Sequence, residues 1–230
     1  MSTRVLASVR GRTIRATRLD PCGVPDPGPC GTVVSTGFIS VTVTGQQVTG
    51  RTYESRDIWG NLCISDSDPD ELRSATVDVT LCAINPDMLQ VLTGRTPVLF
   101  DGEAIGISEG IGRNWDAYSL EVWTKAVGDC GEWGYLLVPY VRNGRVSSPV
   151  DIQNGPLTIS TTGRAYPANG WGAGPYDDHP FRADFADGDI YGMVLTDVAP
   201  PADTDLSLCP DRLIDGARFR IDADESAFIA

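Results

Sequence analysis

Residues 32–45, TVVSTGFISVTVTG, decide the fold class. Successive side chains of a β-strand point to opposite faces of the sheet, so alternate positions share a face. One set of positions is apolar and suits a core: Val33, Ile39, Val41 and Val43. The other set consists of short, uncharged side chains: Thr32, Thr36, Ser40, Thr42 and Thr44. The apolar residues Val34 and Phe38 interrupt this set. Because β-branched side chains occupy both sets, the stretch predicts a strand and not a helix.

The uncharged set of side chains allows three interpretations. It suits a wetted surface that does not bind what passes over it. It also suits a sheet edge that pairs with a neighbouring chain. A plain strand of a β-sandwich is the third interpretation, and the stretch alone does not separate the three.

The composition predicts one large β domain, or one domain with an elaborated end. With 41% hydrophobic residues, the 230-residue chain can build a real core. Its 25 glycines and 16 prolines predict many turns instead of long helices. No apolar run approaches the roughly 20 residues of a membrane span, and the N-terminus lacks the apolar segment of a signal peptide. We therefore expect a protein that folds in a cytoplasm and has no membrane partner.

The charge is strongly acidic and unevenly distributed. A net charge of −13 argues against tight nucleic-acid binding, because phosphate contacts need a basic surface. Residues 1–56 carry seven arginines against three acids, whereas the remainder of the chain is far more acidic. Opposite charges on two parts of one chain suit head-to-tail self-association, although the acidic excess also serves solubility.

The cysteines and the acidic segment predict no metal and no cofactor. No pair of cysteines has the C-x₂₋₄-C spacing of a zinc site. Cys22 and Cys30 bracket a rigid loop and are candidates for a pair, whereas Cys63 and Cys82 are predicted to be buried thiols. Residues 66–71, DSDPDE, have the acidic spacing of a calcium loop, but Glu71 replaces the required glycine, so we predict a solvated turn.

Local signals predict the following elements. A turn at residues 45–47 would make residues 32–53 a hairpin. In residues 74–82, the alternation places Ala75, Val77, Val79 and Leu81 inward. One helix is expected over about residues 85–93, with Asn85 as N-cap, Pro86 in the first turn and Gly94 as C-cap.

The second half of the chain predicts further strands. They are expected over residues 117–125, 132–142, 150–161 and 218–221. Pro139 places the second of these at an edge or a bulge. The dipeptide Asn143-Gly144 is typical of a hairpin turn.

Five motifs in order give the chain a resemblance to the major tail (tail tube) proteins of long-tailed siphophages that infect actinobacteria. They are Gly37-Phe38-Ile39-Ser40-Val41, Asn85-Pro86-Asp87 leading to Thr93-Gly94, Glu121-Val122-Trp123, residues 134–139 (GYLLVP) and residues 170–176 (GWGAGPY). Together they cover most of residues 15–178. The acidic residues after Asp178 fall outside the pattern.

The resemblance implies a mainly β fold, a tail-tube β-sandwich or half-barrel with one short flanking helix. It divides the chain into an N-terminal arm and first strand (1–19), a tail-tube β domain (20–176) and an acidic C-terminal extension (177–230). The extension is expected to pack on the tube domain or on a neighbouring subunit.

The resemblance also implies a structural virion protein without catalysis. Such proteins form hexameric rings that stack into the tail tube, which is assembled in the cytoplasm of the host bacterium. The expected partners are the chain itself, the tape measure protein, and the tail tip and tail terminator proteins. Genomic DNA would pass through the bore without specific binding.

Under this hypothesis, residues divide into two candidate sets. The side chains expected to line the lumen are Thr36, Ser40, Thr42, Thr44, Thr158 and Ser160. The side chains expected at contacts between subunits are Arg4, Arg10, Arg12, Phe38, Trp171 and Tyr176.

Two other classes of protein compete with the tube hypothesis. An enzyme with paired carboxylates would use Glu121 and Glu132, and a hydrolytic triad would need His179, the only histidine, but no G-x-S-x-G motif accompanies it. A tail-associated carbohydrate- or host-binding β-sandwich module would stack sugars on exposed indoles. The candidates for that stacking are Trp59, Trp115, Trp133 and Trp171.

Overall fold

The computed structural model describes most of the chain between residues 8 and 203. The described residues are 8–26, 31–82, 85–100, 103–108, 110, 116–126, 132–147, 158–167, 170–176, 178, 180–181 and 184–203. Predictions that concern Arg4, Cys30, Trp115, His179 or residues 218–221 lie outside this set.

The described chain contains twelve strands and one helix, which confirms a mainly β fold with one short helix. Its elements are β1 (Ser8–Leu19), β2 (Thr32–Ser35), β3 (Phe38–Val48), β4 (Thr52–Arg56), β5 (Leu62–Ser67), β6 (Glu71–Leu81), α1 (Pro86–Thr93), β7 (Pro97–Phe100), β8 (Glu103–Ile107), β9 (Ala117–Ala126), β10 (Trp133–Val146), β11 (Ile159–Ala165) and β12 (Gly192–Thr196).

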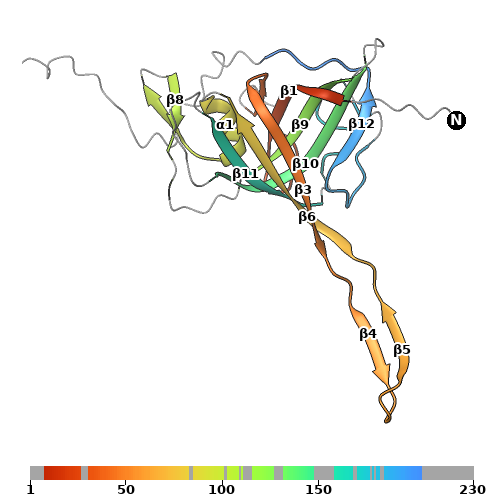
Figure 1. Cartoon of the computed structure of the whole chain (residues 1–230). Helices are drawn as coiled ribbons and strands as arrows, with labels where there is room; N and C mark the ends of the chain where they lie inside the picture. Colours follow the sequence, from red (N-terminus) through yellow and green to blue (C-terminus); the bar gives the residue numbers. More distant parts are fainter. Residues whose placement is uncertain are drawn as a thin grey trace, which may run out of the picture.

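Eight strands form one antiparallel sheet in the order β2-β1-β9-β10-β11-β6-β3, with β12 also paired to β10. Strand β10 gives the sheet its shape. One edge of β10 pairs with β9, whereas the other pairs with β12 over its first half and with β11 over its second half. The sheet therefore divides at β10, and strands β3 and β6 cross in front of β1, β9 and β10 (Figure 1).

Two irregularities bend β10 at this division. The first lies between Val138 and Val141 and contains Pro139, as the bulge prediction requires. The second lies between Arg142 and Arg145, where Asn143 adopts a left-handed φ of 57°. The hairpin predicted at Asn143-Gly144 is therefore wrong, because the strand continues and its positive-φ residue forms a bulge.

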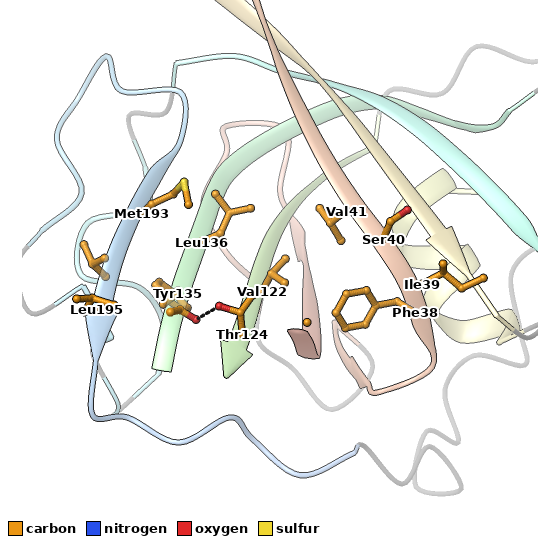
Figure 2. A pocket seen from close by; sticks show the side chains of 13 residues that line it. Phe38, Ile39, Ser40, Val41, Val122, Thr124, Tyr135, Leu136, Met193 and Leu195 are labelled. Atoms are coloured by element: carbon orange, nitrogen blue, oxygen red, sulfur yellow. Dashed lines mark hydrogen bonds between the residues drawn. The ribbon is translucent and has the colours of Figure 1, made fainter. Parts of the chain in front are cut away.

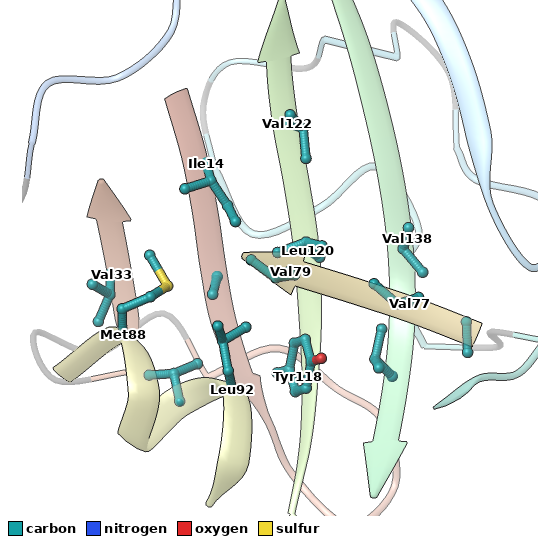
Figure 3. Packing of buried hydrophobic residues seen from close by; sticks show 14 of the residues in the cluster. Ile14, Val33, Val77, Val79, Met88, Leu92, Tyr118, Leu120, Val122 and Val138 are labelled. Carbon is teal, nitrogen blue, oxygen red and sulfur yellow. The ribbon is translucent and has the colours of Figure 1, made fainter. Parts of the chain in front are cut away.

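The main core lies between the two layers of the curved sheet. Figure 3 shows β6 crossing the other strands with Val77 and Val79 directed toward Leu120 and Val138. All four positions predicted to point inward from residues 74–82 are buried, which confirms the alternation in that strand.

Helix α1 covers one end of this core. Its caps are those predicted: the Asn85 side chain accepts a hydrogen bond from the Met88 backbone N–H, Pro86 begins the helix, and Gly94 ends it with φ 61°. Met88 and Leu92 are completely buried against the sheet. An isolated helix of eight residues would be marginal, so this packing is what stabilises it.

The opening stretch forms two strands instead of one. The chain breaks at Thr36 and Gly37, and a register shift between Phe38 and Ser40 leaves Ile39 unpaired and exposed. The alternation predicted Ile39 for the core, and the bulge is the reason that this prediction is wrong. Val33 is completely buried, as predicted.

The predicted hairpin over residues 32–53 is also wrong. Strand β3 runs through Gly45 and Gln47 without turning, because it pairs with β6 along its whole length. The chain turns only at residues 57–61, beyond β4, and returns through β5. Residues 66–71 consequently lie along this hairpin and do not form a separate turn.

The exposed thiols correct another prediction. Cys63 lies on the projecting hairpin and Cys82 follows the last buried residue of β6, so both are exposed instead of buried. Cys22 is an exposed free thiol.

Candidate functional site: a polar sheet face and a projecting hairpin

Strands β3, β6 and β11 present an outward polar face. Their register places nine side chains in three rows across the strands: Ser40–Thr80–Ser160, Thr42–Asp78–Thr162 and Thr44–Thr76–Arg164. Seven of the nine are serine or threonine, and the one acid is balanced by the one arginine. We call these nine residues the polar face.

Two side-chain hydrogen bonds hold residues of the polar face in place. The Thr80 and Ser160 hydroxyls lie 3.0 Å apart across β6 and β11, and Arg164 Nε donates to Ser74 Oγ at 3.2 Å. Short hydroxyl side chains, which make up most of the polar face, do not reach far toward a ligand. Water can wet such a face, and the face has few groups that would bind a polyanion.

Positive charge gathers at only one corner of the polar face. Arg145 stands opposite Thr162 in the register of β10 and β11, so it extends the row that holds Asp78. Together with Arg164 it borders a hollow of about 500 Å³. The carboxylate of Asp78 two strands away limits the positive potential there.

Strands β4 and β5 form a hairpin that projects well beyond the body of the molecule (Figure 1). Its largest apolar side chains are exposed: Ile58 is 92% exposed and Trp59 is 81% exposed, and Leu62 and Ile64 lie beside them. Soluble monomers rarely expose apolar side chains in such a group. The tip is therefore a candidate contact surface.

The turn at the hairpin tip is rigidly built around Asp57. Asp57 Oδ1 accepts hydrogen bonds from the backbone N–H groups of Trp59 (2.9 Å) and Asn61 (2.8 Å), and Oδ2 accepts from Asn61 Nδ2 (3.0 Å). These hydrogen bonds lower the pKa of Asp57, and the bond from the Asn61 side chain has the largest effect. Gly60 supplies the left-handed backbone that the turn requires, with φ 84°. The turn thus presents Ile58 and Trp59 in a fixed conformation.

A buried polar cluster lies on the opposite side of the main sheet from the core. Arg15 on β1 donates to both carboxylate oxygens of Glu121 on β9, from Nε at 2.6 Å and from Nη2 at 2.7 Å. Tyr135 on β10 donates to Glu121 Oε1 at 2.6 Å. Tyr176 stacks on the Arg15 guanidinium, with 3.5 Å between Arg15 Cζ and the ring centroid.

The same cluster joins the late loop to the sheet. The Tyr176 hydroxyl hydrogen bonds to Thr17 and to Thr32, and Asp178 Oδ1 lies 3.9 Å from Arg15 Nη1. Trp171 and Phe185 pack beside Trp123 in a second apolar cluster. These contacts attach the late loop to the sheet at Trp171, Tyr176, Asp178 and Phe185.

Burial and charge set the protonation of this cluster. Burial works against the charged guanidinium, but the hydrogen bonds and charge of Glu121 outweigh it, so the pKa of Arg15 is raised. Burial, with the Glu121 charge and hydrogen bond in addition, raises the pKa of Tyr135 far above its usual range. Burial also raises the pKa values of Tyr118 and Tyr176. All these groups keep their ordinary protonation state at neutral pH.

The predicted lumen residues fall mainly on the polar face. Ser40, Thr42, Thr44 and Ser160 belong to it, and Thr158 is exposed just before β11. Thr36 lies apart at the corner between β2 and β3, where it donates to Asp203 at 3.2 Å. Sequence reasoning did not link Thr76, Thr80 and Thr162 to this face, because only the strand register shows that they are neighbours.

The predicted subunit-contact residues divide into exposed and engaged side chains. Arg10 and Arg12 are exposed on β1. Phe38 is half-buried and packs against the core. Trp171 is buried and Tyr176 is half-buried in the late loop, where both are engaged within the chain.

Two of the described residues nominated for the competing classes, Glu121 and Trp171, are buried within the chain. Glu121 is buried and used by Arg15 and Tyr135, so it does not face a substrate. Trp171 is buried, Trp133 is half-buried and Trp59 stands on the distant hairpin, so these three indoles form no common platform. In the described part of the chain, no three His, Cys, Asp or Glu side chains gather as a metal site.

Comparisons with known proteins assign no family to the chain. Neither the family models nor the curated proteins give a match. Among the described residues, no helix has the length and apolar character to cross a membrane.

Proposed function

We propose that the chain is the structural subunit of a phage tail tube. It would polymerise as stacked hexameric rings in the virion tail, enclose the tape measure protein and form the conduit for DNA ejection. Assembly would take place in the cytoplasm of the host bacterium. The tail tip and terminator proteins would contact the ends of the tube.

The projecting hairpin is the observation that carries this proposal. Ile58 and Trp59 are nearly fully exposed at the end of an arm that the body of the same chain does not cover. Burying such side chains contributes roughly 1.5–3 kcal/mol each. An arm of this kind favours a protein whose stable state is an assembly.

The polar face supports the assignment of the bore. Its nine side chains carry one positive and one negative formal charge, so it neither attracts nor strongly repels phosphate. Strand β3 ends the sheet, and a strand at that position has an edge that a neighbouring copy can extend. Six copies joined through such edges would close a continuous barrel with the polar faces inside.

Negative-stain electron microscopy of the purified protein at rising concentration tests the proposal. We expect rings with a central hole, or hollow tubes. A gold label on Thr42→Cys, in a background with all six native cysteines replaced by serine, should lie in the central channel. A protein that stays monomeric at every concentration, and is absent from the tails of virions that encode it, contradicts the proposal.

A further inference from the structure

An apolar groove lies between β3 and β12 on the body of the molecule (Figure 2). Its volume is about 560 Å³, within the range of about 300–1,000 Å³ typical of clefts that hold a ligand. Phe38 and Val41 form one wall, Val122 and Leu136 form the floor, and Met193 forms part of the other wall. The groove exists because β12 and β11 leave β10 in different directions.

The groove leaves apolar side chains uncovered. Met193 is 74% exposed and Ile39, the bulged residue of β3, is 55% exposed. The Thr124 hydroxyl donates to the Gly134 carbonyl at 3.3 Å, which turns this polar group toward the backbone. A lining of this kind is suited to apolar side chains and offers little to a charged ligand.

A glycine on β1 allows the wall of the groove to form. A Cβ atom on Gly11 would lie 2.5 Å from Phe38 Cζ, so only glycine lets the ring lie over this strand. The ring packs against the main core, and the groove floor residue Val122 belongs to that core. The concave shape is therefore built into the fold and does not depend on a partner.

We propose that this groove receives the hairpin tip of a second copy of the chain. The inference rests on the proposed function and names the surface that takes the arm. The tip supplies exposed apolar side chains, and the groove supplies an apolar surface that no described residue of the same chain covers. The hairpin points away from the body that bears its own groove, so the tip that fills a groove comes from another copy (Figure 1).

The rigidity of the tip favours this contact. The Asp57 hydrogen bonds fix the turn before any contact is made, so docking Ile58 and Trp59 orders little additional backbone. Tryptophan is one of the residue types that most often contribute a large share of the binding energy of an interface.

Charge complementarity supports the same pairing. Residues 49–73, which hold the hairpin, carry six carboxylates against three arginines. Gly11 lies in the lining of the groove between Arg10 and Arg12, both exposed, and Lys125 faces Arg10 in the strand register. The acidic arm would therefore meet a basic rim, which speeds association and fixes orientation.

Such a contact is heterologous, because tip and groove are different surfaces. Each copy gives one tip and accepts one, so the contact propagates from copy to copy. If the series of tip-to-groove contacts closes on itself, it forms a ring. If each contact is offset along the ring axis, it joins a subunit of one ring to a subunit of the next. Both results agree with a tube.

Two matched variants and their mixture test the inference in sedimentation velocity experiments. Trp59→Asp replaces the main apolar side chain of the tip with a charge, and Met193→Asp places a charge in the groove. Ile105→Asp is the control, since Ile105 is an exposed isoleucine on β8 away from both surfaces. We expect each of the first two to weaken self-association by at least about 30-fold, and the control to assemble as wild type. An equimolar mixture of the two variants should form a one-to-one heterodimer, because it retains one intact tip and one intact groove.

Several outcomes would overturn the inference. If Met193→Asp assembles like wild type while Trp59→Asp does not, the tip docks elsewhere and the proposed function survives without the groove. If the mixture forms no heterodimer, tip and groove are not partners. If wild type does not self-associate at all, the pairing of tip and groove fails, and the proposed function fails with it if the protein is also absent from virion tails.

Cross-linking gives a second measurement that does not depend on weakened variants. The exposed thiol of Cys63 is next to the tip residue Leu62. In a background where Cys63 is the only native cysteine kept and the other five are replaced by serine, Met193→Cys should be joined to Cys63 of another copy by a short bismaleimide. Absence of this cross-link in assembled wild-type-like rings contradicts the pairing.

Discussion

The buried pair of Arg15 and Glu121 makes a quantitative prediction about stability. Substituting Glu121→Gln keeps the size of the side chain but removes its charge. The Arg15 guanidinium would then remain buried, without the carboxylate that accepts its hydrogen bonds at 2.6 and 2.7 Å. Removing one partner of a buried pair costs about 3–5 kcal/mol, because the other charge is left uncompensated.

The surroundings place this variant at the lower end of that range. Asp178 lies 3.9 Å from Arg15 Nη1, and the Tyr176 ring stacks on the guanidinium at 3.5 Å. Both still stabilise the cation when Glu121 is neutral. We therefore expect the free energy of unfolding to fall by about 3 kcal/mol.

Urea unfolding, followed at concentrations where the protein is monomeric, measures the effect. With a slope of about 3 kcal/mol per molar urea, a loss of about 3 kcal/mol moves the midpoint by about 1 M while the slope stays unchanged. The control is Glu54→Gln, since Glu54 is half-exposed and lies 3.7 Å from the exposed Arg56. An exposed pair of this kind contributes only about 0–1 kcal/mol.

A double variant separates charge from packing. Arg15→Met combined with Glu121→Leu removes both charges and keeps apolar volume in the cluster, so it should recover most of the lost stability. A loss below about 1 kcal/mol for Glu121→Gln would refute the reasoning. So would a double variant less stable than the single one.

Two further predictions concern protonation and close backbone contact. The pKa of Tyr135 is higher in the folded chain than in the unfolded chain, where it is about 10. The neutral Tyr135 side chain therefore stabilises the fold fully below about pH 10, and this stabilisation is lost as the pH rises above that value. Above that pH, the free energy of unfolding of wild type should decrease with pH more steeply than that of Tyr135→Phe, by about 1.4 kcal/mol per pH unit. Urea unfolding at several pH values measures both dependences. Equal pH dependences of the two proteins would contradict this prediction. Substituting Gly144→Ala should lower the free energy of unfolding by about 1–3 kcal/mol or more, because its Cβ would lie 1.7 Å from the Leu92 carbonyl oxygen. Gly106→Ala, whose Cβ meets nothing within 4 Å, is the control and should change the thermal midpoint little; equal effects of the two variants would contradict the packing argument.

Local sequence signals determined the elements whose stability is local. The capping residues predicted α1, since a side-chain acceptor at Asn85 and a left-handed Gly94 satisfy the helix ends whatever lies around them. Strict alternation predicted the inward residues of β6, because one face of that strand meets the core from Ala75 to Leu81. Pro139 predicted a break in the ladder, because proline has no N–H to donate.

Turn signals failed where long strand pairing was stronger. Gly45 lies in a turn-like sequence, yet β3 continues through it because β6 pairs with β3 on both sides of Gly45. Asn143 forms a bulge instead of a hairpin for the same reason, since β11 pairs with β10 on both sides of it. A turn propensity of one or two residues cannot outweigh a ladder of many hydrogen bonds.

Only the tertiary structure decided which distant residues became neighbours. The sequence showed Ser40 and Thr42 as uncharged, but their rows with Thr80 and Asp78 follow from register. The sequence likewise showed Glu121 as one acid among many, and its partner Arg15 lies 106 positions away. Alternation is a property of neighbouring residues, whereas the burial of a charge depends on which chain segment covers it. The sequence therefore determined the class of fold and the uncharged strand face, and the folded chain decided the buried ion pair, the projecting arm and the groove.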